Sequence, residues 1–319
     1  PRPVAAWEGV RDATAYGATA QRGDTGITLI PEPSVPGDAT LNVNVFAPAD
    51  ATPDAALPVL VWIHGGGYTS GSPASRWYDG DAFARDGVIT VVLSYRLGFE
   101  GFGAVDGAPT NRGLRDQIAA LEWVRDEIRA FGGDPARVTI GGQSAGAGSV
   151  LALLTSPRAR GLFHGAAALS PAVGAVTAVA ARRFAARVAG LAGVGDDSAA
   201  LAAVPEERLR ALQKVAARPE RGRALASLTA LLDDGLPIGP VIDGDLVDGG
   251  VMPRHPLTAL ADSVGADVPL LIGATDDEVT ALTGRYRRLL ALVPVPLALA
   301  ALGLGRSRRR AYLARTPRR

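Results

Sequence analysis

The chain has 319 residues, of which 47% are hydrophobic and 20% charged, and its formal net charge is +1. This composition is typical of a globular protein and argues against wholesale disorder, and the length allows one large α/β domain or two smaller ones. The chain has no cysteine and three histidines, which excludes disulfides, cysteine catalysis and zinc–thiolate sites and argues against a multi-histidine metal site.

Short apolar runs predict the strands. The first run alternates with period two, as a half-buried strand does, and the later ones are continuous. In chain order the runs are Leu41–Phe46, Leu57–His64, Val88–Tyr95, Val138–Gly142, Ala166–Ser170 and Val268–Gly273.

Helical patterns lie between these runs. The clearest is Gly113–Phe131, which ends at Gly132-Gly133. Strands that alternate with helices predict an α/β fold with a mostly parallel central sheet, helices on both faces and an active site at the carboxyl ends of the strands. Residues 175–235 are rich in Ala, Leu and Arg and show no convincing strand. We interpret them as a helical insertion beside the site, within a single domain over 1–319.

Ser144 is the candidate nucleophile. It stands in Gly142-Gln143-Ser144-Ala145-Gly146, between the strand pattern ending at Gly142 and a helix-like segment. Small residues on both sides of a serine allow strand and helix to approach closely, which is the nucleophile elbow of α/β-hydrolases. The string alone is a weak signal in a chain rich in Gly and Ala, and the strand-to-helix context strengthens it.

A second glycine-rich segment follows the strand that ends near Ile63. It reads His64-Gly65-Gly66-Gly67-Tyr68. Consecutive glycines can turn backbone N–H groups into a cavity without side-chain clashes, and this motif type supplies the oxyanion donors of α/β-hydrolases. A merely flexible loop is the alternative. The two motifs in this order predict an α/β-hydrolase.

The ordered motifs resemble those of the type-B carboxylesterases, the family of the cholinesterases and bacterial para-nitrobenzyl esterases. The matching segments are Trp7–Thr14, Leu41–Val45, Ser94–Gly98, Asn111–Gln117 and Phe131–Pro135. The resemblance implies an esterase of small-molecule substrates without cofactor or metal. It also implies that Gly66, Gly67 and Ala145 supply the oxyanion N–H groups. Gln143 stands where a glutamate is usual, so a preference for cationic substrates is in doubt.

The acidic segment Gly273–Glu278 follows the last predicted strand. By the same resemblance Glu278 orients the catalytic base, with Asp276 and Asp277 as alternatives. An acidic helix N-terminus, which the helix dipole favours, is the other interpretation.

No histidine follows Glu278, although the α/β-hydrolase order is Ser, then acid, then His. His64 and His164 match positions where the family's histidines are not the base. His255 lies in a Pro-flanked loop and is the weak stand-in. We therefore expect a fragment, cut at both ends, that lacks the C-terminal strand and the histidine loop and hydrolyses esters poorly. A catalytically silent binding or adhesion-type relative is the alternative.

The C-terminal region combines an apolar run with basic residues. Leu289–Gly305 contains Pro294 and Pro296 and is short for a span of roughly 20 residues, so we expect a buried or interfacial element and no membrane span. Residues 279–319 hold ten arginines and no acid. Because no nucleic-acid module precedes them, we expect a solvated helix face and no nucleic-acid partner. The compartment stays open, with the cytoplasm favoured, and so does the oligomeric state.

Overall fold

The computed structural model describes residues 7–21, 30–218, 237–244, 250–276, 278, 294–301 and 305–315. These residues fall into two compact units. The first is Pro1–Ala217 with Leu236–Gly273, and it contains the sheet. The second is Arg218–Gly235 with Ala274–Arg319.

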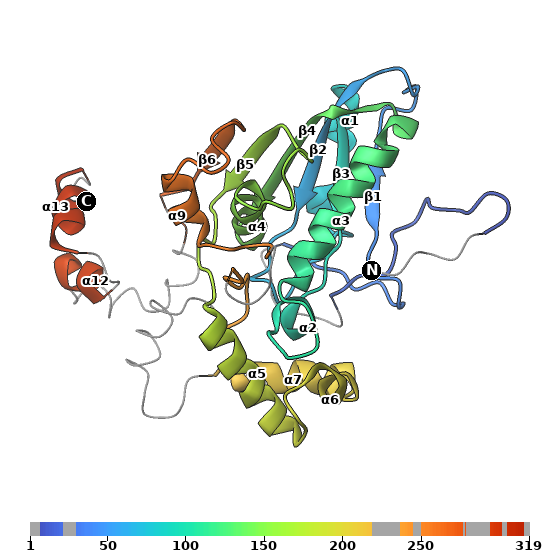
Figure 1. The fold of residues 1–319 in the computed structure, drawn as a ribbon. Helices are drawn as coiled ribbons and strands as arrows, with labels where there is room; N and C mark the ends of the chain where they lie inside the picture. The colour runs from blue at the N-terminus through green and yellow to red at the C-terminus, as the bar shows by residue number, and fades with distance from the viewer. Residues whose placement is uncertain are drawn as a thin grey trace. The chain divides into compact units, whose positions relative to one another are not determined.

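The first unit is built on a six-stranded sheet in the order β1-β3-β2-β4-β5-β6 (Figure 1). β1 pairs antiparallel with β3, and all other neighbours are parallel, so the predicted mostly parallel sheet is confirmed. The strands are β1 Val43–Phe46, β2 Leu57–Ile63, β3 Ile89–Leu93, β4 Gly133–Gln143, β5 Gly165–Leu169 and β6 Leu270–Gly273.

The helices of this unit alternate with the strands (Figure 1). α3 and α4 contact one another and both pack on β4, and α4 also packs on β2 and β5. The described helices are α1 Asp81–Arg85, α2 Gly98–Phe102, α3 Arg112–Glu127, α4 Ala145–Leu154, α5 Ala178–Ala192, α6 Ser198–Ala202, α7 Glu206–Ala216 and α9 Pro256–Ala261, with short 3₁₀ turns at Arg76–Tyr78 and Ile128–Phe131.

The core lies between the sheet and α4. Val61, Ile140 and Ala166 occupy neighbouring positions on β2, β4 and β5, and all three are buried. α4 itself is buried along its whole length, which explains why its sequence is apolar on every side. Because the helix is fixed on several strands at once, the residue that begins it is held firmly.

The outer edge of the sheet is less covered. Leu271 and Ile272 of β6 are 66% and 54% exposed, and Leu169 of β5 is 38% exposed. The sequence predicts that both faces of the sheet are covered. Within the described residues this holds at β3, where every residue is buried, but not at the β6 edge.

The predicted helix over 113–131 is present with one change at its end. α3 continues into the 3₁₀ turn Ile128–Phe131, and Gly132 stops it in a left-handed conformation with φ of 86°. β4 begins at Gly133, earlier than the predicted strand at Val138, because Gly133 pairs with Leu57 ahead of a register shift. The backbone of β2 therefore extends the strand beyond its β-branched residues.

The described part of the predicted insertion, residues 175–218, contains the three helices α5, α6 and α7. Residues 219–235 lie outside the described residues, so the extent of the insertion stays a prediction. α5 contacts α7, and Val188 and Ala189 of α5 are buried in a small apolar cluster with Phe99.

The second unit contains α12 Val295–Ala301 and α13 Arg306–Arg315, which contact one another. Val295 and Leu297 are 53% and 62% exposed, so this described part of the apolar run is not buried in a core. The two prolines and the neighbouring arginines are consistent with an exposed position. Among the described residues, no helix has the length and apolar character needed to cross a bilayer.

Candidate active site

Ser144 stands at the turn between β4 and α4, as predicted. Its φ of 56° and ψ of −119° are unusual for a residue with a side chain, and such a conformation costs about 1–3 kcal/mol unless its surroundings impose it. Here the backbone is held at both ends: the amide donates to Leu169 O at 3.0 Å, and the carbonyl accepts from Gly148 N at 2.9 Å and Ala172 N at 3.0 Å. The chain therefore fixes Ser144 in a strained turn.

Glycines make this turn possible. A Cβ on Gly142 would lie 2.6 Å from the carbonyl carbon of Gly146, and a Cβ on Gly146 would overlap the carbonyl oxygen of Ile63. Strand β4, helix α4 and the end of β2 therefore meet at backbone-to-backbone distance. This close approach is the physical reason for small residues two positions before and after Ser144.

The glycine loop lies directly against the serine. A Cβ on Gly65 would be 3.4 Å from Ser144 Cβ, and Gly66 and Gly67 have φ of 109° and 61°. Within the part of the chain that the structure describes, the amides of Gly66, Gly67 and Ala145 donate to no protein acceptor. These N–H groups are thus available to a ligand near Ser144, and their use as oxyanion donors stays a prediction.

Tyr68 anchors the glycine loop, a role that the sequence did not reveal. Its side chain is buried, and its ring packs edge-on against Phe102 at 5.0 Å between centroids. Its carbonyl accepts from Gly98 N at 2.7 Å. The sequence feature that could have indicated this role is the aromatic residue directly after three glycines, because a buried ring at the end of a loop restricts its movement.

The expected acid belongs to the second unit. Glu278 is exposed, and its Oε1 accepts a hydrogen bond from Thr275 N at 2.7 Å, the arrangement expected at the start of a turn or helix. Asp276 is also exposed, and Asp277 lies outside the described residues. The role of Glu278 therefore stays a prediction.

His64 is enclosed in the core beside the glycine loop. Its ring stacks on Tyr95 at 4.5 Å between centroids, and its Nδ1 lies 2.9 Å from Gly65 O. Burial lowers the pKa of His64 to about 4. A neutral, enclosed ring that faces tyrosines is placed to support the loop.

His164 and His255 lie away from the serine. The amide of His164 donates to Val138 O at 2.7 Å, and the six residues of β4 from Val138 to Gln143, which separate it from Ser144, span roughly 20 Å. The Nδ1 of His255 accepts from Leu257 N at 3.2 Å and caps α9. The structure therefore brings neither histidine to Ser144.

A cavity of about 1040 Å³ begins at the glycine loop. Gly67, Thr69 and Ser70 form one side of it. The other sides come from α2, from the segment before α3 and from α6 and α7. The helical insertion therefore lines a cavity that reaches the glycine loop at Gly67, although Ser144 itself does not line it. The cavity is large enough for a small organic molecule.

Metal binding has no support in the described residues, where no cluster of three or more His, Asp or Glu side chains is suited to holding a metal ion.

The chain matches a known protein family and several known proteins. The profile described as "Carboxylesterase family" matches residues 1–288. The para-nitrobenzyl esterase of Bacillus subtilis is 38% identical over 287 residues, which are 87% of this chain and 55% of that protein. A cocaine esterase of Oryctolagus cuniculus is 37% identical over 293 residues, which are 87% of this chain and 51% of that protein.

Solved structures agree. A structure titled "PNB esterase" superposes on this chain with a TM-score of 0.71 and 37% sequence identity. The match covers 86% of this chain and 55% of the chain in that structure. A carboxylesterase of Geobacillus stearothermophilus gives a TM-score of 0.69 at 34% identity, with 90% and 57% covered. The chain thus spans about half the length of the relatives that it matches.

Proposed function

The chain belongs to the carboxylesterase family, and on that premise we propose that the protein hydrolyses carboxylic esters with Ser144 as nucleophile. The single observation that carries the proposal is the placement of Ser144 in a strained turn beside the unpartnered amides of Gly66 and Gly67. A nucleophile and donors for a developing oxyanion are the two elements that acyl transfer needs in one place.

In the proposed reaction Ser144 Oγ attacks the ester carbonyl and passes its proton to a base. The amides of Gly66, Gly67 and Ala145 stabilise the negative charge on the carbonyl oxygen, and each such donor lowers the barrier by roughly 3–4 kcal/mol in well-formed sites. The base returns the proton to the leaving alcohol, which leaves an acyl-enzyme. Water, activated by the same base, then attacks the acyl-enzyme and releases the acid.

None of the three histidines is placed to act as the general base for Ser144. His64 is enclosed among tyrosines, His164 lies beside Val138 of β4, away from the Ser144 end of that strand, and His255 caps a helix. We propose that a histidine outside these 319 residues acts as the base and that Glu278 orients it. The relatives, whose lengths are about twice the matched portion, leave room for such a segment.

Covalent labelling tests the proposal. The full-length protein should react with a fluorophosphonate at Ser144, located by mass spectrometry of the peptide, and Ser144→Ala should abolish the label. The exposed Ser263 gives a matched control, because Ser263→Ala should label as the parent does. A folded full-length protein that takes no label would contradict ester hydrolysis and favour a silent binding relative.

The source of the base has its own test. Residues 1–319 alone should turn over a para-nitrophenyl ester far more slowly than the full-length protein, since removal of a triad member leaves only roughly 10³–10⁴-fold acceleration over water. Efficient turnover by residues 1–319 that is lost in His255→Gln would overturn the external base and assign the role to His255.

A further inference from the structure

One face of α7 forms a wall of the cavity that starts at the glycine loop. The side chains that line it recur at helical spacing, so a single face of the helix is turned toward the cavity. They are Glu206, Leu209, Arg210, Gln213 and Lys214. Gly67 of the glycine loop lines the same cavity. A molecule whose reacting carbonyl lies at that loop would therefore extend toward α7.

The wall is fixed in place by a buried amide. Gln213 is 7% exposed, and its Oε1 accepts a hydrogen bond from Phe99 N at 2.8 Å. This bond joins α7 to α2. Lys214 follows Gln213 directly in the helix, so its backbone position is set by this buried contact, while its side chain is exposed.

Opposite charges already cancel in one part of the cavity wall. Arg210 and Glu206 lie one helical turn apart, with Arg210 Nε 3.8 Å from Glu206 Oε1. Among the described residues Lys214 has no such partner: it forms no ion pair and no side-chain hydrogen bond. It is also the only lysine of the chain.

Arg112 adds a second positive charge, from α3. It is 9% exposed and lines the cavity. Its hydrogen bonds go to backbone carbonyls and not to a carboxylate: Nη1 to Pro109 O at 2.8 Å, Nη2 to Phe99 O at 2.9 Å, and Nε to Glu100 O. The backbone oxygens accept the hydrogen bonds of the guanidinium, but they carry no net charge, so its positive charge is not neutralised.

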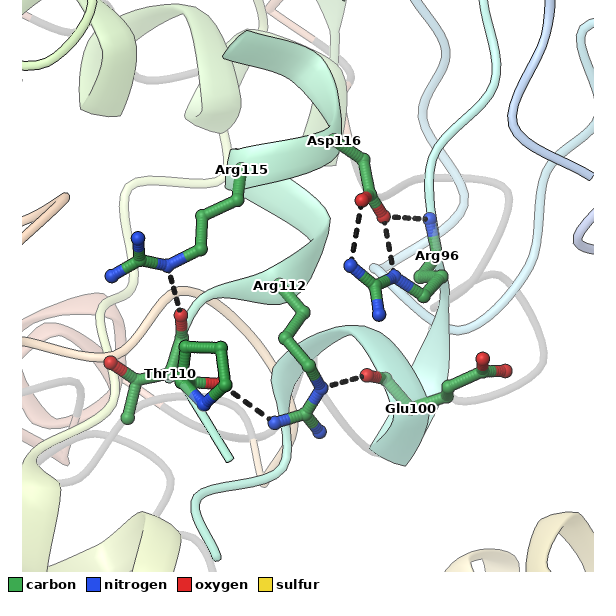
Figure 2. A network of polar contacts seen from close by, with 7 residues as sticks. Arg96, Glu100, Thr110, Arg112, Arg115 and Asp116 are labelled. Atoms are coloured by element: carbon green, nitrogen blue, oxygen red, sulfur yellow. Dashed lines mark hydrogen bonds and ion pairs between the residues drawn. The ribbon is translucent and has the colours of Figure 1, made fainter. Parts of the chain in front are cut away.

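Figure 2 shows the contact between Arg112 and Glu100. The guanidinium of Arg112 faces the backbone oxygen of Glu100, while the Glu100 carboxylate is directed away from it. Burial, together with the nearby Arg96, lowers the pKa of Arg112 to about 10, so the group remains charged at neutral pH. The acid of the lining on this side, Glu100, and Lys214 are both exposed, so water screens both charges, and Arg112 is the buried positive charge of this wall.

We infer that this cavity favours esters that carry a negative charge, such as a monoester of a dicarboxylic acid, with Lys214 as the specificity-determining residue. The ester group would lie at Gly67, and the free carboxylate would lie toward Lys214 with the field of Arg112 behind it. The inference rests on the proposed function for its reactive end, but the anion preference of the cavity can be measured without any reaction.

Two stable amides make that measurement. The mono-4-nitroanilide of glutaric acid and the 4-nitroanilide of pentanoic acid have the same length, and they differ in a terminal carboxylate against a methyl group. Residues 1–319 should bind the anionic amide about fivefold more tightly by calorimetry, as expected for one partly exposed charge pair. The preference should weaken as the salt concentration rises.

Lys214 gives a direct readout of where the ligand lies. An amine-reactive reagent should modify this single lysine, and peptide mass spectrometry should show protection by the anionic amide at lower concentration than by the neutral one. Lys214→Gln should remove the roughly fivefold preference, and Lys214→Glu should reverse it. Lys214→Arg should keep it, and Arg183→Gln, an equal charge loss on the exposed surface of α5, should leave it unchanged.

Equal affinity for the two amides, or a preference that Lys214→Gln does not alter, would overturn the inference. Failure of this inference is separable from failure of the proposed function. Labelling of Ser144 without an anion preference would retain the esterase and remove the substrate class. An anion preference without labelling of Ser144 would retain the binding site and remove the esterase.

Discussion

Gly146 in the first turn of α4 lies against the carbonyl oxygen of Ile63 at the end of β2, with no room between them for a Cβ. The contact joins the segment that carries Ser144 to the strand that leads into the glycine loop. The relative position of Ser144 and Gly65–Gly67 is therefore set by backbone packing.

Gly146→Ala should separate these two segments. Forcing a methyl group into this contact is expected to destabilise the protein by about 2–3 kcal/mol and to abolish fluorophosphonate labelling of Ser144. Gly190→Ala is the matched control. Gly190 is an exposed residue of α5, and a Cβ there would meet nothing within 4 Å, so alanine should stabilise the helix by about 0.5–1 kcal/mol. Urea unfolding measures both, and equal effects would refute the packing argument.

The pair Arg96–Asp116 (Figure 2) predicts that a buried ion pair contributes more to stability than an exposed one. Asp116 Oδ2 accepts from Arg96 Nε at 2.8 Å and from Arg96 N at 3.0 Å, and Oδ1 accepts from Nη2 at 2.8 Å. The Asp116 side chain is 1% exposed and that of Arg96 25%. Asp116→Asn should therefore cost about 2–3 kcal/mol of unfolding free energy, somewhat less than a fully buried pair.

The exposed pair Arg125–Asp126 provides the control for that experiment. Its Nε–Oδ1 distance is 2.7 Å, but both side chains are more than half exposed. Asp126→Asn should produce no measurable change in the urea midpoint, because water solvates both charges in either state. A comparable loss in both variants would mean that burial does not decide the strength of these pairs.

His64 predicts a dependence of stability on pH. Burial lowers its pKa in the folded state to about 4, from 6.5 for an ordinary histidine. Between these values the unfolded chain binds a proton that the folded chain does not, so stability falls as pH decreases from about 6.5 to 4. The loss should reach about 3 kcal/mol at the lower end.

His64→Phe isolates this effect, because a phenyl ring retains the stacking on Tyr95 but does not titrate. The difference in unfolding free energy between the parent and this variant should be constant above pH 7 and should shift in favour of the variant by about 3 kcal/mol on going to pH 4. A pH-independent difference in urea unfolding would show that the ring of His64 is not kept neutral in the folded protein.

Local patterns made much of this structure predictable. β2 (Leu57–Ile63) and β3 (Ile89–Leu93) are mostly apolar and rich in β-branched residues, and the turn at Ser144 is dictated by its small neighbours. The sequence did not reveal Asp243, which is fully buried and accepts hydrogen bonds from Thr110, Asn111, Val251 and Met252. More than 130 residues separate Asn111 from Asp243, and no local periodicity encodes a contact of that kind.

Residue 143 sets the charge directly beside Ser144. Gln143 precedes Ser144, and a Cβ on Gly65 would lie 3.3 Å from its Oε1, so the amide is next to the glycine loop. Gln143→Glu places a negative charge there with almost no change of shape. It should raise the preference of Ser144 for a cationic reagent over a neutral one of equal size by about fivefold, the effect of one partly screened charge pair.

Two phosphonate reagents measure this preference, one with a trimethylammonium group and the other with a tert-butyl group. The second-order rate constants for labelling of Ser144 should give a cationic-to-neutral ratio that rises in Gln143→Glu and falls again with added salt. Asp134→Asn, a loss of charge at a partly buried position at the far end of β4, should leave the ratio as in the parent. A ratio unaffected by Gln143→Glu would show that this side chain does not contribute to the field at the serine, and would leave the cavity lining as the source of any charge selectivity.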